Sequence, residues 1–124
     1  MKTVKLERLY DVAFDLMNIH NPDDFEFSMT IVFDEGVMID FDKNHRPVGI
    51  DLINFSKKIK ILPQNLKNLE IKSSLSISRK FLTFKFEVRY MESPRVYEKV
   101  ISNDWGFPPE EFEFQIVNVS LEEV

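Results

Sequence analysis

The sequence predicts a mainly β fold, or an α+β fold, in which antiparallel meanders form a sandwich or a partly closed barrel with one or two short helices. Apolar and polar residues alternate with a period of two in Phe25–Phe33 and again in Val37–Phe41, as in strands with one buried face. A third alternating run, Leu82–Tyr90, follows in the second half of the chain. Runs of this kind, joined by short turns, predict antiparallel meanders.

A three-strand meander is expected in the first half. Gly36 suits the turn that joins its first two strands, because glycine reaches positive φ without a steric cost. Pro47 cannot donate a hydrogen bond to a neighbouring strand, so it is expected to begin the third strand, Val48–Ile53. One or two short strands and a loop are expected before this meander: Thr3–Glu7, Tyr10–Ile19 and His20–Asp24.

A second meander is expected near the end of the chain. Ile71–Ile77 and Leu82–Tyr90 predict a hairpin in which Phe84 and Phe86 lie on the buried face. A turn, a strand, a loop and a closing strand should follow: Glu92–Arg95, Val96–Ser102, Asn103–Pro109 and Phe112–Leu121. We treat residues 1–124 as a single domain, with 63–124 forming a second β meander packed on 10–62.

The residues between the two meanders predict short helical segments. Ser56 is expected to cap Lys57–Leu62, a short helix or further strand that Pro63 ends. Pro63–Leu69 predicts a helical turn, with proline at its first position and two leucines one turn apart.

Short motifs are spread over residues 10–62. They are Tyr10-Asp11, Asp15, Leu16–Ile19, Gly36–Asp40, Phe41-Asp42, Val48–Leu52 and Ser56-Lys57. On these motifs the first half resembles the prokaryotic family catalogued as domain of unknown function 2283. It departs from that family at His45 and Arg46, where a turn glycine is usual, and in its long spacing between Ile19 and Gly36. The resemblance implies a small β-rich unit with a short helix, no assigned catalytic residues, and an antitoxin-like role.

Composition limits the classes of function. The chain has 124 residues, of which 44% are hydrophobic and 30% charged, as in one globular domain. A net charge of -5 disfavours broad binding to nucleic acid or membrane surfaces, and the absence of cysteine excludes disulfides and thiolate sites. Glu7, Arg8 and Asp11 interrupt any signal-peptide core, and no apolar run is long enough to span a bilayer. We therefore expect a cytoplasmic protein without a cofactor and without a membrane partner.

The acidic turn of the first meander suggests a metal site. Four oxygen-bearing residues fall at positions 1, 3, 5 and 12 of the calcium-loop pattern: Asp40, Asp42, Asn44 and Asp51. His45 replaces the glycine of that pattern, Asp51 replaces its glutamate, and Pro47 lies inside the loop. The competing interpretation is that Asp40 and Asp42 face solvent from a strand while Asn44 makes the turn.

His20 and His45 are the only histidines, and both lie in expected polar loops. They could bind a metal together with a carboxylate, or they could simply be exposed imidazoles. The carboxylates available for such a site are Asp23, Asp24 and Asp42. None of the three glycines belongs to a nucleophile elbow, a phosphate loop or a dinucleotide fingerprint, so we do not expect an enzyme.

Basic residues cluster between the two halves: Lys57, Lys58, Lys60, Lys67, Lys72, Arg79 and Lys80. This cluster predicts either an RNA-binding face or an ordinary solvated surface. RNA stacking needs exposed rings near the lysines, and Phe81 is the only such candidate because Phe84 and Phe86 are expected in the core.

Trp105 and Phe107 lie in one loop, where they are either interface anchors or caps over the open end of the sheet. The leading interpretation is a non-enzymatic protein-interaction module that binds a protein partner or forms a homodimer through an unpaired edge strand. Its expected interaction residues are Trp105, Phe107, Lys57, Lys58 and Lys60. One alternative is a metal-binding protein or hydrolytic enzyme that uses His20, His45 and the acidic turn. Another is an RNA-binding protein that uses the Lys57–Lys80 cluster.

Overall fold

The structure is a computed structural model, and it describes residues 1–63, 66 and 69–118. These residues form nine strands and one short helix, so the predicted mainly β fold is confirmed. The strands are β1 (Lys2–Asp11), β2 (Leu16–His20), β3 (Phe27–Asp34), β4 (Val37–Asp42), β5 (Pro47–Ile53), β6 (Glu70–Ile77), β7 (Phe81–Tyr90), β8 (Ser93–Ser102) and β9 (Glu110–Asn118). The helix is α1 (Phe55–Ile59).

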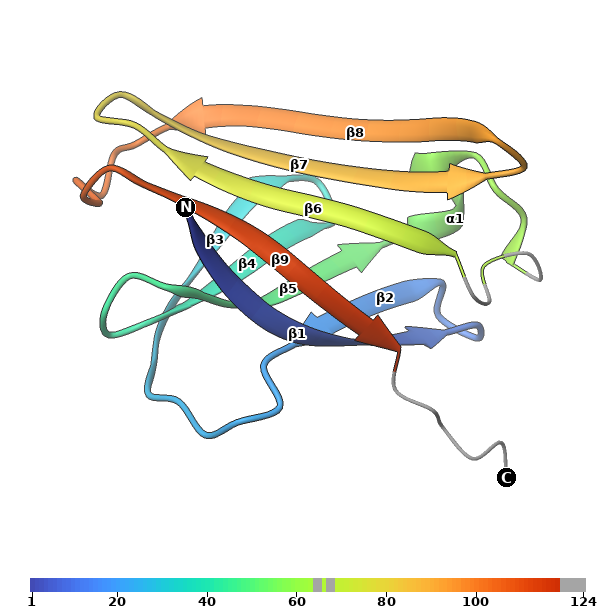
Figure 1. Cartoon of the computed structure of the whole chain (residues 1–124), viewed down its shortest axis with the longest axis horizontal. Helices are drawn as coiled ribbons and strands as arrows, with labels where there is room; N and C mark the ends of the chain where they lie inside the picture. Colours follow the sequence, from blue (N-terminus) through green and yellow to red (C-terminus); the bar gives the residue numbers. More distant parts are fainter. Residues whose placement is uncertain (64–65, 67–68, 119–124) are drawn as a thin grey trace.

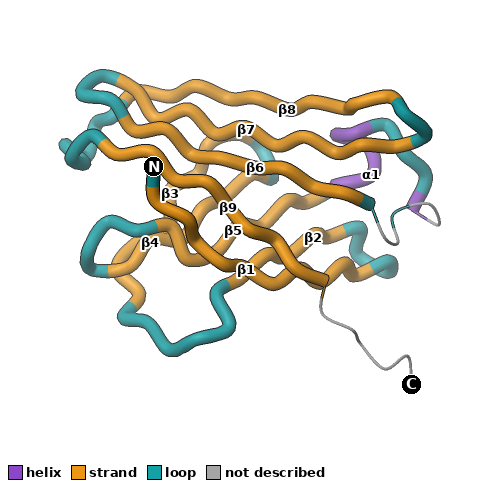
Figure 2. The backbone as a smooth tube through the Cα atoms, in the orientation of Figure 1, coloured by secondary structure: helices purple, strands orange, loops and turns teal. Residues whose placement is uncertain are grey.

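All nine strands belong to one sheet, in the order β3-β4-β5-β2-β1-β9-β6-β7-β8. Each half contributes a three-strand meander and one strand that returns beside it, which is a Greek-key arrangement. In Figure 1, β6, β7 and β8 lie above β2 and β5, while β9 and β1 cross diagonally in front, from the upper left to the lower right. The backbone trace in Figure 2 follows the same curl, so the sheet forms a partly closed barrel.

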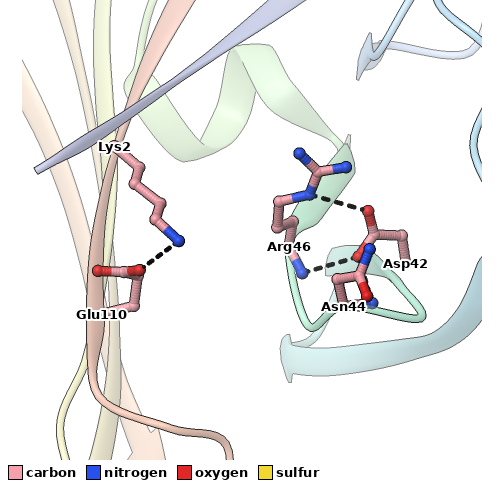
Figure 3. A network of polar contacts seen from close by, with 5 residues as sticks. All are labelled: Lys2, Asp42, Asn44, Arg46 and Glu110. Carbon is pink, nitrogen blue, oxygen red and sulfur yellow. Dashed lines mark hydrogen bonds and ion pairs between the residues drawn. The ribbon is translucent and has the colours of Figure 1, made fainter.

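The first and last strands join the two halves of the chain. β1 and β9 pair in parallel from Lys2 opposite Phe112 to Arg8 opposite Asn118, whereas the other described pairs are antiparallel. Lys2 Nζ lies 2.7 Å from Glu110 Oε1 at the beginning of this pair (Figure 3). The sheet is therefore mixed, whereas the sequence predicted only antiparallel meanders.

Phenylalanine rings fill much of the interior. Phe84 and Phe86 are 0% and 1% exposed, which confirms the predicted register of β7. Phe86 contacts Phe55 edge to face, with ring centroids 5.5 Å apart, and Phe84 contacts Phe33 at 6.1 Å. These rings come from β3, α1 and β7, so the two layers and the helix share one core.

Helix α1 covers one end of the barrel with its buried Phe55 and Ile59. Its N-cap is Asn54, at φ 56°, and not Ser56 as predicted. Asparagine tolerates this left-handed conformation, so the helix begins two residues earlier and Ser56 lies inside it. The described ranges contain no helix that is long and apolar enough to cross a membrane.

The hairpin between β7 and β8 turns earlier than the sequence predicted. Its turn residues are Met91 and Glu92, at φ 48° and 63°, and Pro94 lies within β8. Two residues with positive φ suit the twist of a tight hairpin, and proline is tolerated in an edge strand. The predicted turn, Glu92–Arg95, therefore lies too far towards the C-terminus, because most of these residues belong to β8.

Two expected segments extend beyond the described residues. β9 begins at Glu110 and reaches Asn118, so the end of the predicted strand Phe112–Leu121 lies outside them. Most of the predicted turn Pro63–Leu69 also lies outside them, although the Leu66 N–H donates to the Pro63 carbonyl over 3.2 Å.

The two edge strands, β3 and β8, approach each other at one point. The Tyr97 hydroxyl donates to Asp34 Oδ2 over 2.8 Å, and Lys99 Nζ lies 3.9 Å from Asp34 Oδ1. The hydrogen bond from Tyr97 lowers the pKa of Asp34 below its usual value. Side chains therefore link the edges at Asp34.

Candidate interaction surface

The turn between β1 and β2 holds three consecutive apolar residues outside the barrel. Val12 and Phe14 are 65% and 75% exposed, and Ala13 is exposed between them. The Asp15 N–H donates to the Val12 carbonyl over 3.4 Å, and the Phe14 N–H donates to Asp11 Oδ1 over 3.2 Å. Asp15 follows at φ 49°, a conformation that aspartate tolerates better than most residues. The turn is thus held by its own backbone and by Asp11.

Asp15 fastens this turn to α1 and to β1. Its carboxylate accepts hydrogen bonds from the Ser56 N–H at 2.9 Å, the Ser56 hydroxyl at 2.6 Å and the Tyr10 hydroxyl at 2.5 Å. Burial alone would raise the pKa of Asp15, but the hydrogen bonds from Ser56 and Tyr10 outweigh it and lower this pKa. Burial and the bond to Asp15 raise the pKa of Tyr10 well above its ordinary value. Asp15 therefore anchors the turn as an ionised acceptor.

Two further apolar side chains extend the exposed surface beyond the turn. Leu16 lies opposite Ile53 on the outer face of β2 and β5, where Ile53 is 40% exposed. We refer to Val12, Phe14, Leu16 and Ile53 as the turn patch. Apolar surface presented on a fixed backbone is typical of protein-binding sites.

The structure places the three predicted interaction lysines on and around α1. Lys57 is exposed and close enough to Asp15 to help lower the pKa of that carboxyl group. Lys58 Nζ donates to the Ile53 carbonyl over 2.6 Å. Lys60 ends the helix, and its carbonyl accepts a hydrogen bond from Arg95 Nη1 over 3.0 Å. Lys57 and Lys58 therefore border the turn patch, and Lys60 lies next to β8.

The basic cluster predicted from the sequence does not form one surface. Lys72 lies near the start of β6, whereas Arg79 and Lys80 lie in the turn after its end. At about 3.3 Å per residue, Lys72 and Arg79 are roughly 23 Å apart along the strand. In Figure 1 this turn and α1 lie at opposite ends of the barrel. Lys67 lies outside the described residues.

The two rings of the loop between β8 and β9 have different environments. Phe107 is 3% exposed and contacts Phe41 edge to face, with ring centroids 5.0 Å apart. The Asn103 side chain holds the loop, since it accepts from the Phe107 N–H and donates to the Phe107 carbonyl. Phe107 is therefore a core residue, and Trp105, at 39% exposure, is the ring that a partner could contact.

The acidic turn is not arranged as a calcium loop. Asp42 is 3% exposed, and it accepts hydrogen bonds from the backbone N–H groups of Asn44 and Arg46 and from Arg46 Nε, over 2.8, 3.0 and 3.1 Å (Figure 3). Asp40 accepts instead from Thr30, and Asp51 from Asn18, each over 2.5 Å. The three carboxylates thus accept hydrogen bonds from different neighbours and do not converge on one point.

The two histidines serve separate parts of the fold. His20 Nδ1 lies 2.9 Å from Asn18 Oδ1 on the outer face of β2. His45, at φ 61°, packs its ring on Phe107, with centroids 4.7 Å apart. Across residues 1–63, 66 and 69–118 no three histidine, aspartate or glutamate side chains are grouped so that they could hold a metal ion.

A groove of about 710 Å³ opens where β6 and β9 separate. These strands pair only between Ser73–Ile77 and Glu110–Phe114, after which β9 continues beside β1. Ile71 and Ile116 contribute apolar lining, and charged residues of both signs surround them: Lys72, Lys85, Glu87 and Glu113. These charges select neither an anion nor a cation.

The sequence analysis missed Val12 and Phe14. Their signal is a run of three apolar residues, Val12–Phe14, between the turn-forming residues Asp11 and Asp15. Treating Tyr10–Ile19 as one segment concealed this break in the strand.

Comparison with known proteins gives no relative for this chain: no family model, no curated protein and no solved structure matches it. The resemblance of residues 10–62 to the family catalogued as domain of unknown function 2283 therefore stays a prediction.

Proposed function

We propose that the chain is a non-enzymatic protein-interaction module whose turn patch binds an apolar pocket on a partner protein. The turn itself carries the proposal, because Phe14 is 75% exposed on a backbone that Asp11 and Asp15 hold in place. A loop that is already ordered loses little conformational entropy on binding. Large aromatic anchors supply much of the energy at many protein interfaces.

The use of the aspartates supports a role without catalysis. Asp15 and Asp42 each accept three hydrogen bonds from neighbouring parts of the fold. Carboxylates engaged in this way hold turns in place, and their acceptor atoms are already occupied.

Charge around the turn patch favours a particular kind of partner. Asp11 and Asp15 both direct carboxylate oxygens at donors of their own fold, whereas Lys57 is exposed beside Asp15. A partner whose apolar pocket has an acidic rim would complement this lysine. Cytoplasmic localisation and an antitoxin-like role belong to the same proposal, and they rest on the cysteine-free composition and on the resemblance of residues 10–62.

Comparative affinity capture from cells of the native source tests this function. The tagged parent, Phe14→Ser and Phe81→Ser are used as baits under identical conditions. Phe81 is a matched control, because its ring is 49% exposed at the start of β7, away from the turn patch. We expect a protein that co-purifies with the parent and with Phe81→Ser but not with Phe14→Ser.

Two results would contradict the proposal. One is that no protein is enriched by the parent, and the other is that every enriched protein is retained by Phe14→Ser. Capture of the expected partner should also weaken as the ionic strength rises, because Lys57 lies at the rim of the contact.

A further inference from the structure

The two edges of the sheet differ in how well they are protected. Side chains of β8 contact α1 and the end of β3: Arg95 donates to the Lys60 carbonyl, and Tyr97 donates to Asp34. β8 also contains Pro94 and three charged side chains, Arg95, Glu98 and Lys99. Proline, charges and a covering helix are features that prevent an edge strand from pairing with another chain.

β3 lacks most of these protections. Its seven residues Phe27–Phe33 include no charge, proline or glycine. Phe27 and Val32 are 57% and 62% exposed, and Ser28 and Thr30 are exposed between them. Bulges interrupt the pairing with β4 near both ends, but Met29–Val32 pairs regularly. Uncharged strands of this composition tend to pair through their open edges.

We propose that β3 pairs with β3 of a second copy of this chain in antiparallel orientation, forming a two-fold symmetric dimer. Residues directly opposite each other in such a pair share a face of the sheet. With the symmetry axis at Thr30, Ser28 of one copy lies beside Val32 of its partner. No charge opposes a like charge within Met29–Val32, so self-pairing meets no electrostatic penalty there.

The charges that flank this segment are compensated within each copy. Glu26 forms an ion pair with Lys43 over 2.8 Å. Asp34, at the other end of β3, binds Tyr97 and lies near Lys99. Acidic groups that approach across the two-fold axis are therefore already paired with donors or cations.

The protected β8 edge determines the size of the assembly. If both edges could pair, β3 of one copy would join β8 of the next and the sheet would extend without limit. Because only β3 is open, self-pairing closes at two copies. The β3 edge is separate from the turn patch. An experiment can therefore contradict the dimer without contradicting partner binding, and the reverse.

Sedimentation velocity of the purified chain tests the dimer, at protein concentrations up to about 0.5 mM, where even weak pairs associate. The parent should pass from the 14.7 kDa monomer to a dimer of about 29 kDa, twice that mass. Val32→Lys should stay monomeric, while Val96→Lys, a matched exposed valine on β8, should dimerise like the parent. Phe14→Ser should also dimerise.

A monomeric parent over the whole concentration range would overturn the proposal. Equal dimerisation of Val32→Lys and Val96→Lys would overturn it too, as would loss of the dimer in both variants. If Val32→Lys does not fold, amide hydrogen exchange of the parent tests the β3 pairing instead. Protection of Met29–Val32 that rises with protein concentration supports β3 pairing, and protection that does not change contradicts it.

Discussion

Asp15 shows how single aspartates organise this molecule at the residue scale. It binds Ser56, 41 residues further along the chain, and Tyr10 on the preceding strand. Asp42 binds two backbone N–H groups of its own turn in the same way. A buried or half-buried carboxylate that satisfies several donors fixes a loop more firmly than apolar contacts alone, because its geometry is directional.

Replacement of Asp15 by asparagine should lower the free energy of unfolding by about 1.5–3 kcal/mol at pH 7, the usual value of hydrogen bonds to a charged group. The pKa of Asp15 is lowered in the folded protein, so its contribution is complete above the ordinary aspartate pKa, near about 4. That contribution is lost as the pH falls through the lowered value. Urea denaturation of parent and variant should therefore give converging stabilities below about pH 4.

Asp24→Asn is the control for this prediction, because Asp24 is exposed in the loop before β3. Its effect should stay within about 0.5 kcal/mol. An Asp15→Asn protein as stable as the parent at pH 7 would show that these hydrogen bonds do not anchor the turn.

β7 shows at the element scale what an alternating strand contributes. Its even-numbered residues from Leu82 to Val88 are buried, and Lys85 is exposed on the other face. Phe86 is surrounded by Phe55 of the helix and by Phe84 of its own strand. One face of β7 therefore holds the helix against the sheet.

Truncation of Phe86 to alanine should cost about 3–5 kcal/mol of unfolding free energy, from lost transfer energy and from the cavity left behind. Lys85→Ala should stay within about 0.5 kcal/mol, because solvated charges contribute little. Chemical denaturation of both variants beside the parent measures the difference. Nearly equal stabilities of Phe86→Ala and the parent would contradict the register of β7 and its place in the core.

The parallel pair of β1 and β9 is the main feature at the scale of the whole molecule. It joins the two Greek keys into one sheet, so neither half completes the barrel alone. Pairing the two ends of the chain has a high entropic cost of loop closure. The pair therefore becomes favourable only when the rest of the sheet has formed. We therefore expect the barrel to unfold as one cooperative unit.

An engineered cysteine pair tests this topology, because the chain has no native cysteine. Thr3 and Glu113 are exposed and lie directly opposite each other in the β1–β9 register. Thr3→Cys with Glu113→Cys should form an intramolecular disulfide on mild oxidation, measured by loss of free thiols in the monomer. Thr3→Cys with Glu111→Cys, offset by two residues, should stay reduced, and equal oxidation of both pairs would contradict the register.

The strands were predictable and this pairing was not, for a physical reason. Alternation in Leu82–Val88 shows which face is buried, because burial determines residue type there. It carries no information on which strand lies beside β1, since β9 follows more than a hundred residues later. The prediction of Ser56 as a cap failed similarly, because its partner Asp15 is distant in sequence.

The site was predicted in part. Lys57 and Lys58 were expected at the surface, and the structure places them beside the turn. Phe14 was missed because an apolar residue in a turn resembles a strand residue until the two aspartates on either side of the turn are read as hydrogen-bond acceptors. Phe107 was interpreted as either an interface anchor or a cap over the open end of the sheet, and its burial against Phe41 favours the cap.

The central claim is that the turn patch is the binding surface. Its most direct test is the dissociation constant between this chain and the captured partner. Isothermal titration would compare the parent with Phe14→Ser and Phe14→Leu. If Phe14 fills the partner's pocket, Phe14→Ser should weaken binding by about 2 kcal/mol, or roughly 30-fold, and Phe14→Leu by less. A dissociation constant for Phe14→Ser within about twofold of the parent value would contradict the claim.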